Sequence, residues 1–220
     1  TFWRVLIGGV AVLAVAQLSG QVLAFAEWRR LVPVGLLVAL HFLGFIAAVA
    51  WGPVATAVII VYTAPAITAV LAALFLGERL AWREWLGVAL AFAGLVLAAS
   101  PGQVGIVPQA VAAAIVSAVA LALYRIAGRR LLARYPASGY SAAVYLLGAL
   151  WLSPLLVADR GSWTSLGEVL AVIALGIGPL AIGHTLCNRA ARALHPSIIV
   201  LLSSLEVPGG ALLAALVFGE

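Results

Sequence analysis

The sequence predicts an all-α membrane protein of about eight helical spans, and three features of the sequence support this prediction. First, 65% of the 220 residues are hydrophobic and 9% are charged, and the mean hydropathy is +1.21. Soluble domains have about 45–50% apolar and about 25% charged residues, so a soluble fold of this length could not bury so much apolar surface. Second, turn-forming residues divide the chain into apolar runs long enough to span a membrane. Third, the basic residues gather in alternate loops.

Charged residues and turn formers mark the breaks between the apolar runs, for example at Gly52-Pro53 and His195-Pro196. A span needs about 20 apolar residues to cross a hydrocarbon core of about 30 Å. The runs are too long for the strands of a membrane barrel and do not alternate as those strands do, which favours helices. The predicted spans are Val5–Phe25, Leu31–Trp51, Val54–Leu76, Trp85–Ala99, Val107–Ile126, Tyr140–Val157, Leu170–Ala193 and Pro196–Phe218.

The arginines predict the orientation of these spans, because cytoplasmic loops are enriched in basic residues. If the first run passes from outside to inside, only Arg4 and Arg160 lie outside. One span more or fewer would destroy the bias, so the span count and the topology support each other. The bias also explains the net charge of +5 without a nucleic-acid partner. The predicted cytoplasmic arginines are Arg29, Arg30, Arg79, Arg83, Arg125, Arg129, Arg130, Arg134, Arg189 and Arg192.

A weak internal repeat relates the two halves of the chain. An offset of 142 residues places Gly77-Glu78 on Gly219-Glu220, and it places Leu-Ala-Ala-Leu at 71–74 on the same four residues at 213–216. In the predicted topology the first Gly-Glu ends a span inside and the second ends a span outside. The two halves would therefore cross the membrane in opposite directions, as the inverted repeats of many secondary transporters do.

The chain resembles the EamA family of the drug/metabolite transporter (DMT) superfamily. The resemblance implies a ten-helix fold of two inverted five-helix repeats, in which the visible spans are the second to the ninth helix. Residues 1–100 would form the first EamA repeat, lacking its first helix, and residues 101–220 the second repeat, lacking its last helix. Both ends of the chain are therefore expected to be missing. The matching segments are Phe-Trp-Arg at 2–4, Tyr-Thr-Ala-Pro at 62–65, Leu-Gly-Glu-Arg-Leu at 76–80, Gly-His-Thr-Leu-Cys-Asn at 183–188 and Leu-Leu-Ser-Ser-Leu-Glu-Val-Pro at 201–208.

Three ionisable side chains near mid-span are the first candidates for a substrate site, because such groups are energetically costly in a membrane. Glu206 lies ten residues beyond Pro196, which corresponds to a depth of about 15 Å in a helix. His184 and His41 lie near the middle of equivalent spans in the two halves. Glu206 and His184 are also the candidates for proton coupling. For each residue a packing or hydrogen-bonding role is the alternative.

Other polar and aromatic side chains at similar depth complete the predicted substrate site: Tyr62, Thr63, Tyr124, Trp151 and Asn188. A tyrosine in a cavity can stack on a solute and also donate a hydrogen bond. Gly176, Gly178 and Pro179 predict a kink in the span that contains His184.

These features predict a secondary transporter that works by alternating access. The resemblance implies export of amino acids, related small solutes or drugs across the inner membrane of a prokaryote, and proton coupling is a hypothesis based on Glu206 and His184. One alternative is a nucleotide-sugar or sugar-phosphate carrier. It is disfavoured because Arg4 and Arg125 are predicted near span ends rather than at mid-depth. Another alternative is a membrane helper subunit that transports nothing.

Motifs for other functions are missing from the sequence. It has no Gly-rich phosphate loop, no HExxH or GxSxG motif and no Cys/His metal spacing, so no enzyme activity, cofactor or metal is predicted. The expected partners are a small-molecule substrate and the lipid bilayer. The protein is expected to be a monomer or a homodimer. A stripe of small residues is expected to pack against another helix, within the monomer or, as the alternative, between two copies: Gly87, Ala91, Gly94 and Ala98.

Overall fold

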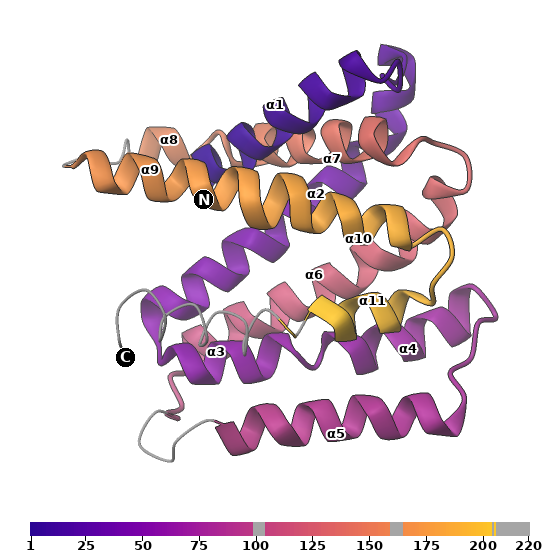
Figure 1. Cartoon of the computed structure of the whole chain (residues 1–220). Coiled ribbons are helices and arrows are strands. Elements are labelled where there is room, and N and C mark those ends of the chain that lie inside the picture. Colours follow the sequence, from indigo (N-terminus) through magenta and orange to yellow (C-terminus); the bar gives the residue numbers. More distant parts are fainter. Residues whose placement is uncertain (99–103, 159–164, 204, 206–220) are drawn as a thin grey trace.

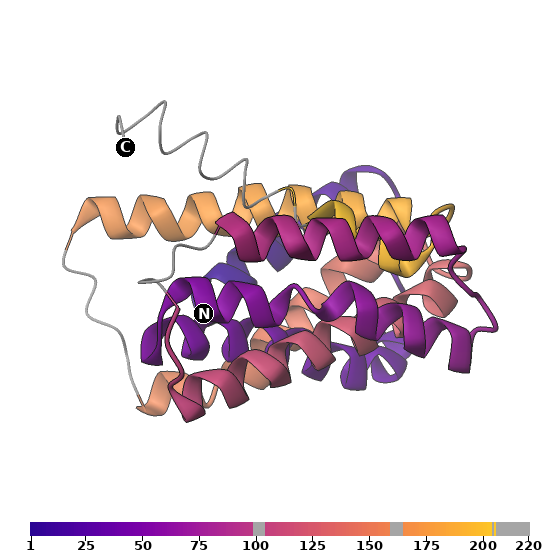
Figure 2. The same cartoon turned by 90° about the horizontal axis from the view of Figure 1, so that it is seen from below.

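The chain folds into a bundle of long helices that lie side by side (Figures 1 and 2). The computed structural model describes residues 1–98, 104–158, 165–203 and 205, and within these ranges it has helices and no strand. The elements in chain order are α1 (Phe2–Leu18), α2 (Phe25–Trp51), α3 (Val54–Val61), α4 (Ala64–Phe75), α5 (Trp82–Ala98), α6 (Pro108–Leu132), α7 (Ala137–Leu152), α8 (Leu155–Ala158), α9 (Leu166–Leu175), the π-helix η2 (Gly176–His184), α10 (Thr185–Ala190) and α11 (Pro196–Ser203).

Each predicted span corresponds to helix in the described residues, and the eighth is described as helix up to Ser203. Several boundaries differ from the prediction because charged residues do not end these helices. Helix α2 begins at Phe25, six residues before the predicted start, and it includes an ion pair of 3.1 Å between Glu27 and Arg30 one turn apart. Helix α6 continues past the predicted end at Ile126 to Leu132. Arginine side chains at helix ends can extend to the membrane surface, so a charge there does not interrupt the helix.

Within the described residues, four helical segments are long and apolar enough to cross a membrane: Phe25–Trp51, Val54–Phe75, Pro108–Leu132 and Leu166–Ala190. Helices α1 and α7 are shorter and also apolar. The multi-pass membrane architecture is therefore confirmed.

The two halves of the chain are inverted copies of one another, as predicted. At the offset of 142 residues α3 falls on α11 with the same bounds, α2 falls on α9–η2–α10, and α1 falls on α7 and α8. Figure 1 shows that the two members of each pair run in opposite directions. Helices of the two halves also pack on each other across the bundle, since α1 contacts its equivalent α7, and α4, which continues the span of α3, contacts α11. The two repeats therefore pack against each other through several pairs of helices.

One end of the bundle carries most of the arginines. Figure 1 places there the end of α1, the start of α2 and the ends of α4, α6 and α10. We call it the arginine-rich end, and in the predicted topology it faces the cytoplasm.

Glycines set how closely the helices approach. A Cβ atom on Gly44 of α2 would lie 2.7 Å from the carbonyl oxygen of Ala113 in α6, so only glycine fits at this contact. Helix α5 differs, because a Cβ atom on Gly87 or Gly94 would meet no described atom within 4 Å. These two positions therefore contact no other described helix, and packing of the stripe within the monomer stays a prediction. A dimer contact at this stripe stays a prediction.

Candidate functional site: a cavity between the repeats

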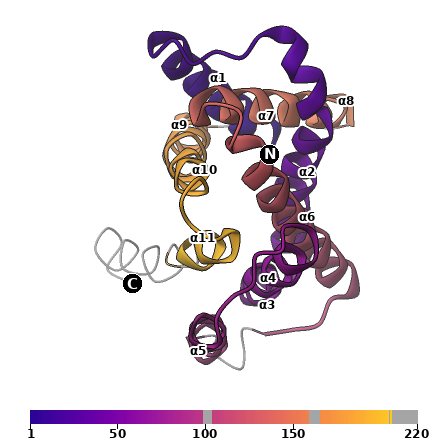
Figure 3. The same cartoon turned by 90° about the vertical axis from the view of Figure 1, so that its right-hand side faces the viewer.

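A cavity of about 340 Å³ lies between the two halves of the chain. Figure 3 looks along the bundle and shows α2 and α6 on one side and α9, α10 and α11 on the other. The apolar part of the lining includes three aromatic rings, and the polar part includes two arginines and two histidines. The lining residues are Arg4, His41, Phe42, Phe45, Val61, Tyr62, Leu121, Arg125, Pro179, Gly183, His184, Cys187 and Leu202.

The two predicted histidines face each other in this cavity. The ring centroids of His41 and His184 are 6.3 Å apart, and Phe42 contacts His184 edge-on with a centroid distance of 5.5 Å. The π-helix η2 carries Pro179 and ends at His184. Proline has no N–H to donate, and the wider π turn is a common response to an interrupted helix ladder at functional sites. The helix is thus π-helical at the position where the sequence predicts a kink, and the kink itself stays a prediction.

A buried serine fixes the orientation of His41. The Nδ1 atom of His41 lies 3.2 Å from the carbonyl oxygen of Ser117 and 3.0 Å from the Ser117 hydroxyl oxygen. The same hydroxyl donates to the backbone oxygen of His41 at 2.9 Å. Ser117 belongs to α6, and the contact requires the close α2–α6 approach at Gly44. His41 is therefore held rigidly against the second half of the chain.

Arg125 is the main site residue that sequence analysis missed. It is 3% exposed and lines the cavity, together with Arg4, whose guanidinium lies 5.0 Å from the centre of the Phe42 ring. Both arginines were predicted near span ends rather than at mid-depth, yet both line the cavity. The error came from ending the span at Ile126, because α6 continues to Leu132 and Arg125 is therefore well inside the helix.

The predicted site residues Asn188 and Tyr124 lie behind Arg125 and do not line the cavity. Arg125 Nη1 donates to Asn188 Oδ1 at 3.0 Å, and its guanidinium lies 5.3 Å from the centre of the Tyr124 ring. Asn188 Nδ2 lies 2.7 Å from the Tyr124 hydroxyl, 2.9 Å from Ser141 Oγ and 3.2 Å from the Tyr145 hydroxyl. The four hydrogen-bond partners of Asn188 are all buried, so this network fixes the position of the Arg125 guanidinium.

The remaining predicted site residues differ in position. Tyr62 lies in the break between α3 and α4 and lines the cavity. Thr63 donates to the carbonyl oxygen of Ile60 at 2.7 Å and is not part of the cavity lining. Trp151 is 46% exposed, donates to the carbonyl oxygen of Val32 at 3.1 Å and also lies outside the lining. Glu206 lies outside the described residues, and its role stays a prediction.

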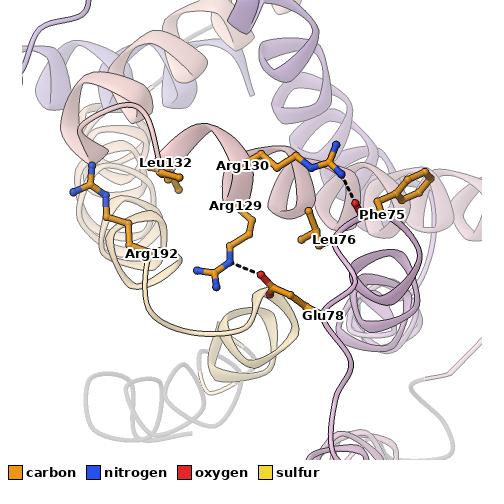
Figure 4. Close-up of a pocket in the computed structure, with 8 residues that line it drawn as sticks. Phe75, Leu76, Glu78, Arg129, Arg130, Leu132 and Arg192 are labelled. Atoms are coloured by element: carbon orange, nitrogen blue, oxygen red, sulfur yellow. Dashed lines mark hydrogen bonds and ion pairs between the residues drawn. The ribbon is translucent and has the colours of Figure 1, made fainter.

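A second pocket, of about 650 Å³, lies at the arginine-rich end (Figure 4). Arg129 Nε forms an ion pair with Glu78 Oε1 at 3.0 Å, and its Nη1 donates to the carbonyl oxygen of Ala191 at 2.7 Å. Arg130 donates to the carbonyl oxygen of Phe75, and Arg192 to that of Tyr135. Each arginine of this pocket therefore has an acceptor from the protein. In the described part of the chain no three His, Cys, Asp or Glu side chains are grouped so that they could hold a metal ion.

Comparison with known proteins gives a family and two named relatives. The model of the EamA-like transporter family matches residues 1–100 and again residues 109–220. A protein of Streptantibioticus cattleyicolor named "Probable terminal-alkyne amino-acid exporter" is 32% identical over 177 residues, covering 76% of this chain and 58% of that protein. The aromatic amino acid exporter YddG of Ancylobacter novellus is 34% identical over 157 residues, covering 68% of this chain and 53% of that protein.

A solved crystal structure has the same fold. It superposes with a TM-score of 0.80 at 27% sequence identity, over 98% of this chain and 76% of that chain. The chain spans about half the length of the curated relatives it matches.

Proposed function

Since the chain belongs to the EamA-like transporter family, we propose that it exports amino acids or related small solutes by alternating access. The observation that carries this proposal is the cavity of about 340 Å³, whose lining comes from both inverted repeats. In transporters built from inverted repeats, the solute site lies at the interface of the repeats, and rocking of one repeat against the other exposes it to each side in turn. His41 and His184, one from each repeat, meet at this interface.

The chemistry of the lining supports a small solute with both polar and apolar parts. Arg4 and Arg125 offer positive charge, and Phe42, Phe45 and Tyr62 offer aromatic surface. The volume is near the lower end of the range for ligand pockets, about 300–1,000 Å³. Two relatives carry names that describe amino-acid exporters. Amino acids fit this combination of charge, aromatic surface and size, and the inner membrane of a prokaryote is the proposed location.

Proton coupling through His184 or Glu206 is a further part of the proposal. His184 is a cavity residue, so a proton bound there would be close to the solute. A group that gains and loses a proton at membrane depth is suited to couple solute movement to a proton gradient.

The sugar-phosphate carrier remains the second candidate function, because Arg4 and Arg125 both line the cavity. Phosphate groups are common ligands of arginine. The two functions differ in the solute that exchanges across the membrane, so a transport assay separates them.

The test is solute exchange in proteoliposomes loaded with labelled L-phenylalanine, L-leucine or glucose 6-phosphate. We expect exchange of the amino acids above that of empty liposomes, and no exchange of the sugar phosphate. Exchange of glucose 6-phosphate alone would favour the second candidate. No exchange of any solute, together with a partner protein that co-purifies, would favour a helper subunit and reject export.

The coupling hypothesis needs a separate experiment. An imposed pH gradient should accelerate amino-acid movement in the unaltered protein, and His184→Ala or Glu206→Gln should remove that acceleration. A matched control is Arg83→Gln, because Arg83 is exposed on α5 and is not part of the cavity lining. An equal response to the gradient in all four proteins would reject coupling through these residues.

A further inference from the structure

Arg125 is a buried charge inside an apolar bundle. It lies in α6, a helix long and apolar enough to cross the membrane, and it is 3% exposed. An arginine inside a membrane span is energetically costly, and such residues usually pair with an acid or face a functional cavity. Arg125 faces the cavity between the repeats.

The described residues supply no acid for this charge. The ion pairs found among them join Glu27 to Arg30 and Glu78 to Arg129, and neither includes Arg125. The Nε atom of Arg125 is buried and has no hydrogen-bond partner in the described structure. A buried donor without an acceptor costs about 1–3 kcal/mol, and more when the group is charged. An anionic group of a solute bound in the cavity would supply the counter-charge that the described residues do not.

The described residues hold the guanidinium of Arg125 in position but do not neutralise its charge. Asn188 accepts from Nη1 through its amide oxygen at 3.0 Å, where an aspartate of nearly the same shape would neutralise the charge. Asn188 is itself held by the hydroxyl groups of Tyr124, Ser141 and Tyr145. A preorganised, charged guanidinium on the wall of a cavity is suited to bind a carboxylate, because charged hydrogen bonds are the stronger ones.

We propose that Arg125 binds the carboxylate of the transported solute, so that the cavity selects carboxylic acids over their amides and over cationic compounds. The inference rests on the proposed transport of small solutes and names the chemical group that the site recognises. The aromatic rings of Phe42, Phe45 and Tyr62 line the same cavity and accept the apolar part of the solute. Arg4 stacks on Phe42 and adds positive charge to the lining.

Binding to the purified protein in lipid nanodiscs tests the inference without measuring transport. The probes are L-phenylalanine, N-acetyl-L-phenylalanine, which keeps the carboxylate but lacks the ammonium group, and L-phenylalaninamide, which lacks the carboxylate. We expect both acids to bind at least about 10-fold more tightly than the amide, the effect of losing one charged hydrogen bond. Arg125→Gln should reduce this preference to within about 2-fold, and Arg125→Lys should keep part of it because the charge remains.

The matched control is Arg83→Gln, which should keep the full preference for the acids because Arg83 is exposed on α5. Circular dichroism and gel filtration establish that each variant is folded, and if Arg125→Gln does not fold, Arg125→Lys carries the test through its weakened preference. Unaltered protein that binds the amide as tightly as the acids, or that binds none of the probes, overturns the inference. The inference is also overturned if Arg125→Gln keeps the preference for the acids. It is overturned as well if added sodium chloride abolishes that preference in the unaltered protein, because the site would then bind an inorganic anion.

The outcomes separate this inference from the proposed function. Acid-selective binding without solute exchange in proteoliposomes would reject export and keep the role of Arg125. Exchange of amino acids at an unchanged rate in Arg125→Gln would keep export and reject the role of Arg125.

Discussion

The central cavity and the pocket at the arginine-rich end both contain arginines, but these arginines differ in burial and in their hydrogen-bond partners. At the end of the bundle Arg129 has a carboxylate partner in Glu78, and its guanidinium is about one quarter exposed (Figure 4). In the cavity Arg125 is 3% exposed and has the neutral amide of Asn188 as its hydrogen-bond partner. Water can solvate the first arginine, so its ion pair adds little, whereas the second is buried and forms no ion pair with any acid in the described part of the chain. The contrast indicates a structural role for Arg129 and a binding role for Arg125.

The test with the largest expected effect introduces an acid beside Arg125, so that the cavity contains an ion pair like the one in the end pocket. Asn188→Asp should place a carboxylate beside Arg125 that competes with the solute carboxylate. The surrounding hydroxyl groups of Tyr124, Ser141 and Tyr145 can rotate to donate to the new acid. We expect amino-acid exchange in proteoliposomes to fall by about 100-fold, or about 2.7 kcal/mol, which lies within the range for a buried charged pair.

The thermal unfolding midpoint of Asn188→Asp should stay level or rise, because the charge of Arg125 gains a partner. Arg83→Gln is the control for exchange. Normal exchange in a folded Asn188→Asp protein would show that a free guanidinium is not needed.

A second test disturbs the wall of the cavity. In Gly44→Ala the new Cβ would lie 2.7 Å from the carbonyl oxygen of Ala113 and push α2 away from α6. We expect the free energy of unfolding to fall by about 1–3 kcal/mol, as in overpacked cores. Solute binding should weaken as well, because the α2–α6 contact positions His41 and Arg125.

The control for this test is Gly87→Ala on α5, where the new Cβ meets no described atom. That change should stabilise the helix by up to about 1 kcal/mol, since alanine is the better helix former. Equal effects of the two substitutions on the unfolding midpoint would contradict the close approach at Gly44.

A third test removes the acid from the end pocket, so that its arginine has an amide beside it, as Arg125 has in the cavity. Glu78→Gln replaces the acid beside Arg129 with an amide. Because both side chains are partly exposed, we expect a loss of at most about 1 kcal/mol in unfolding free energy, and the loss should shrink at high salt. Binding of N-acetyl-L-phenylalanine should not change. A double-mutant cycle with Arg129→Gln measures the coupling, and a coupling above about 2 kcal/mol would show that this pair is not solvent-screened.

The smallest expected effect concerns Trp151, which the sequence suggested as a site residue. Its indole donates to the carbonyl oxygen of Val32 and is 46% exposed, away from the cavity lining. Trp151→Phe should therefore leave amino-acid exchange within about 2-fold of the unaltered rate, while the loss of one exposed hydrogen bond lowers the unfolding free energy by up to about 1 kcal/mol. A large loss of exchange would place Trp151 on the solute path after all.

Sequence patterns predicted the candidate site in part. His41, His184 and Tyr62 were chosen as polar side chains at mid-span, and all three line one cavity. Asn188 and Tyr124 were chosen by the same rule, but they lie behind the lining and hold Arg125. Depth along a span follows from residue spacing, whereas the direction in which a side chain points depends on the helices around it. Arg125 was missed for a related reason, because its charge was taken as the end of the span.

The sequence by itself determined the membrane class, the helical spans and the inverted repeat. These properties depend on apolar composition, on turn residues and on the arginine bias, all of which can be read locally or by aligning one half of the chain with the other. Only the tertiary structure decided which polar groups share a cavity and which of them lack a partner. The environment of Arg125 is set by α1, α2, α6 and η2–α10 together, elements that come from both halves of the chain. Burial and hydrogen-bond satisfaction are properties of that packing, and they distinguish a binding arginine from a structural one.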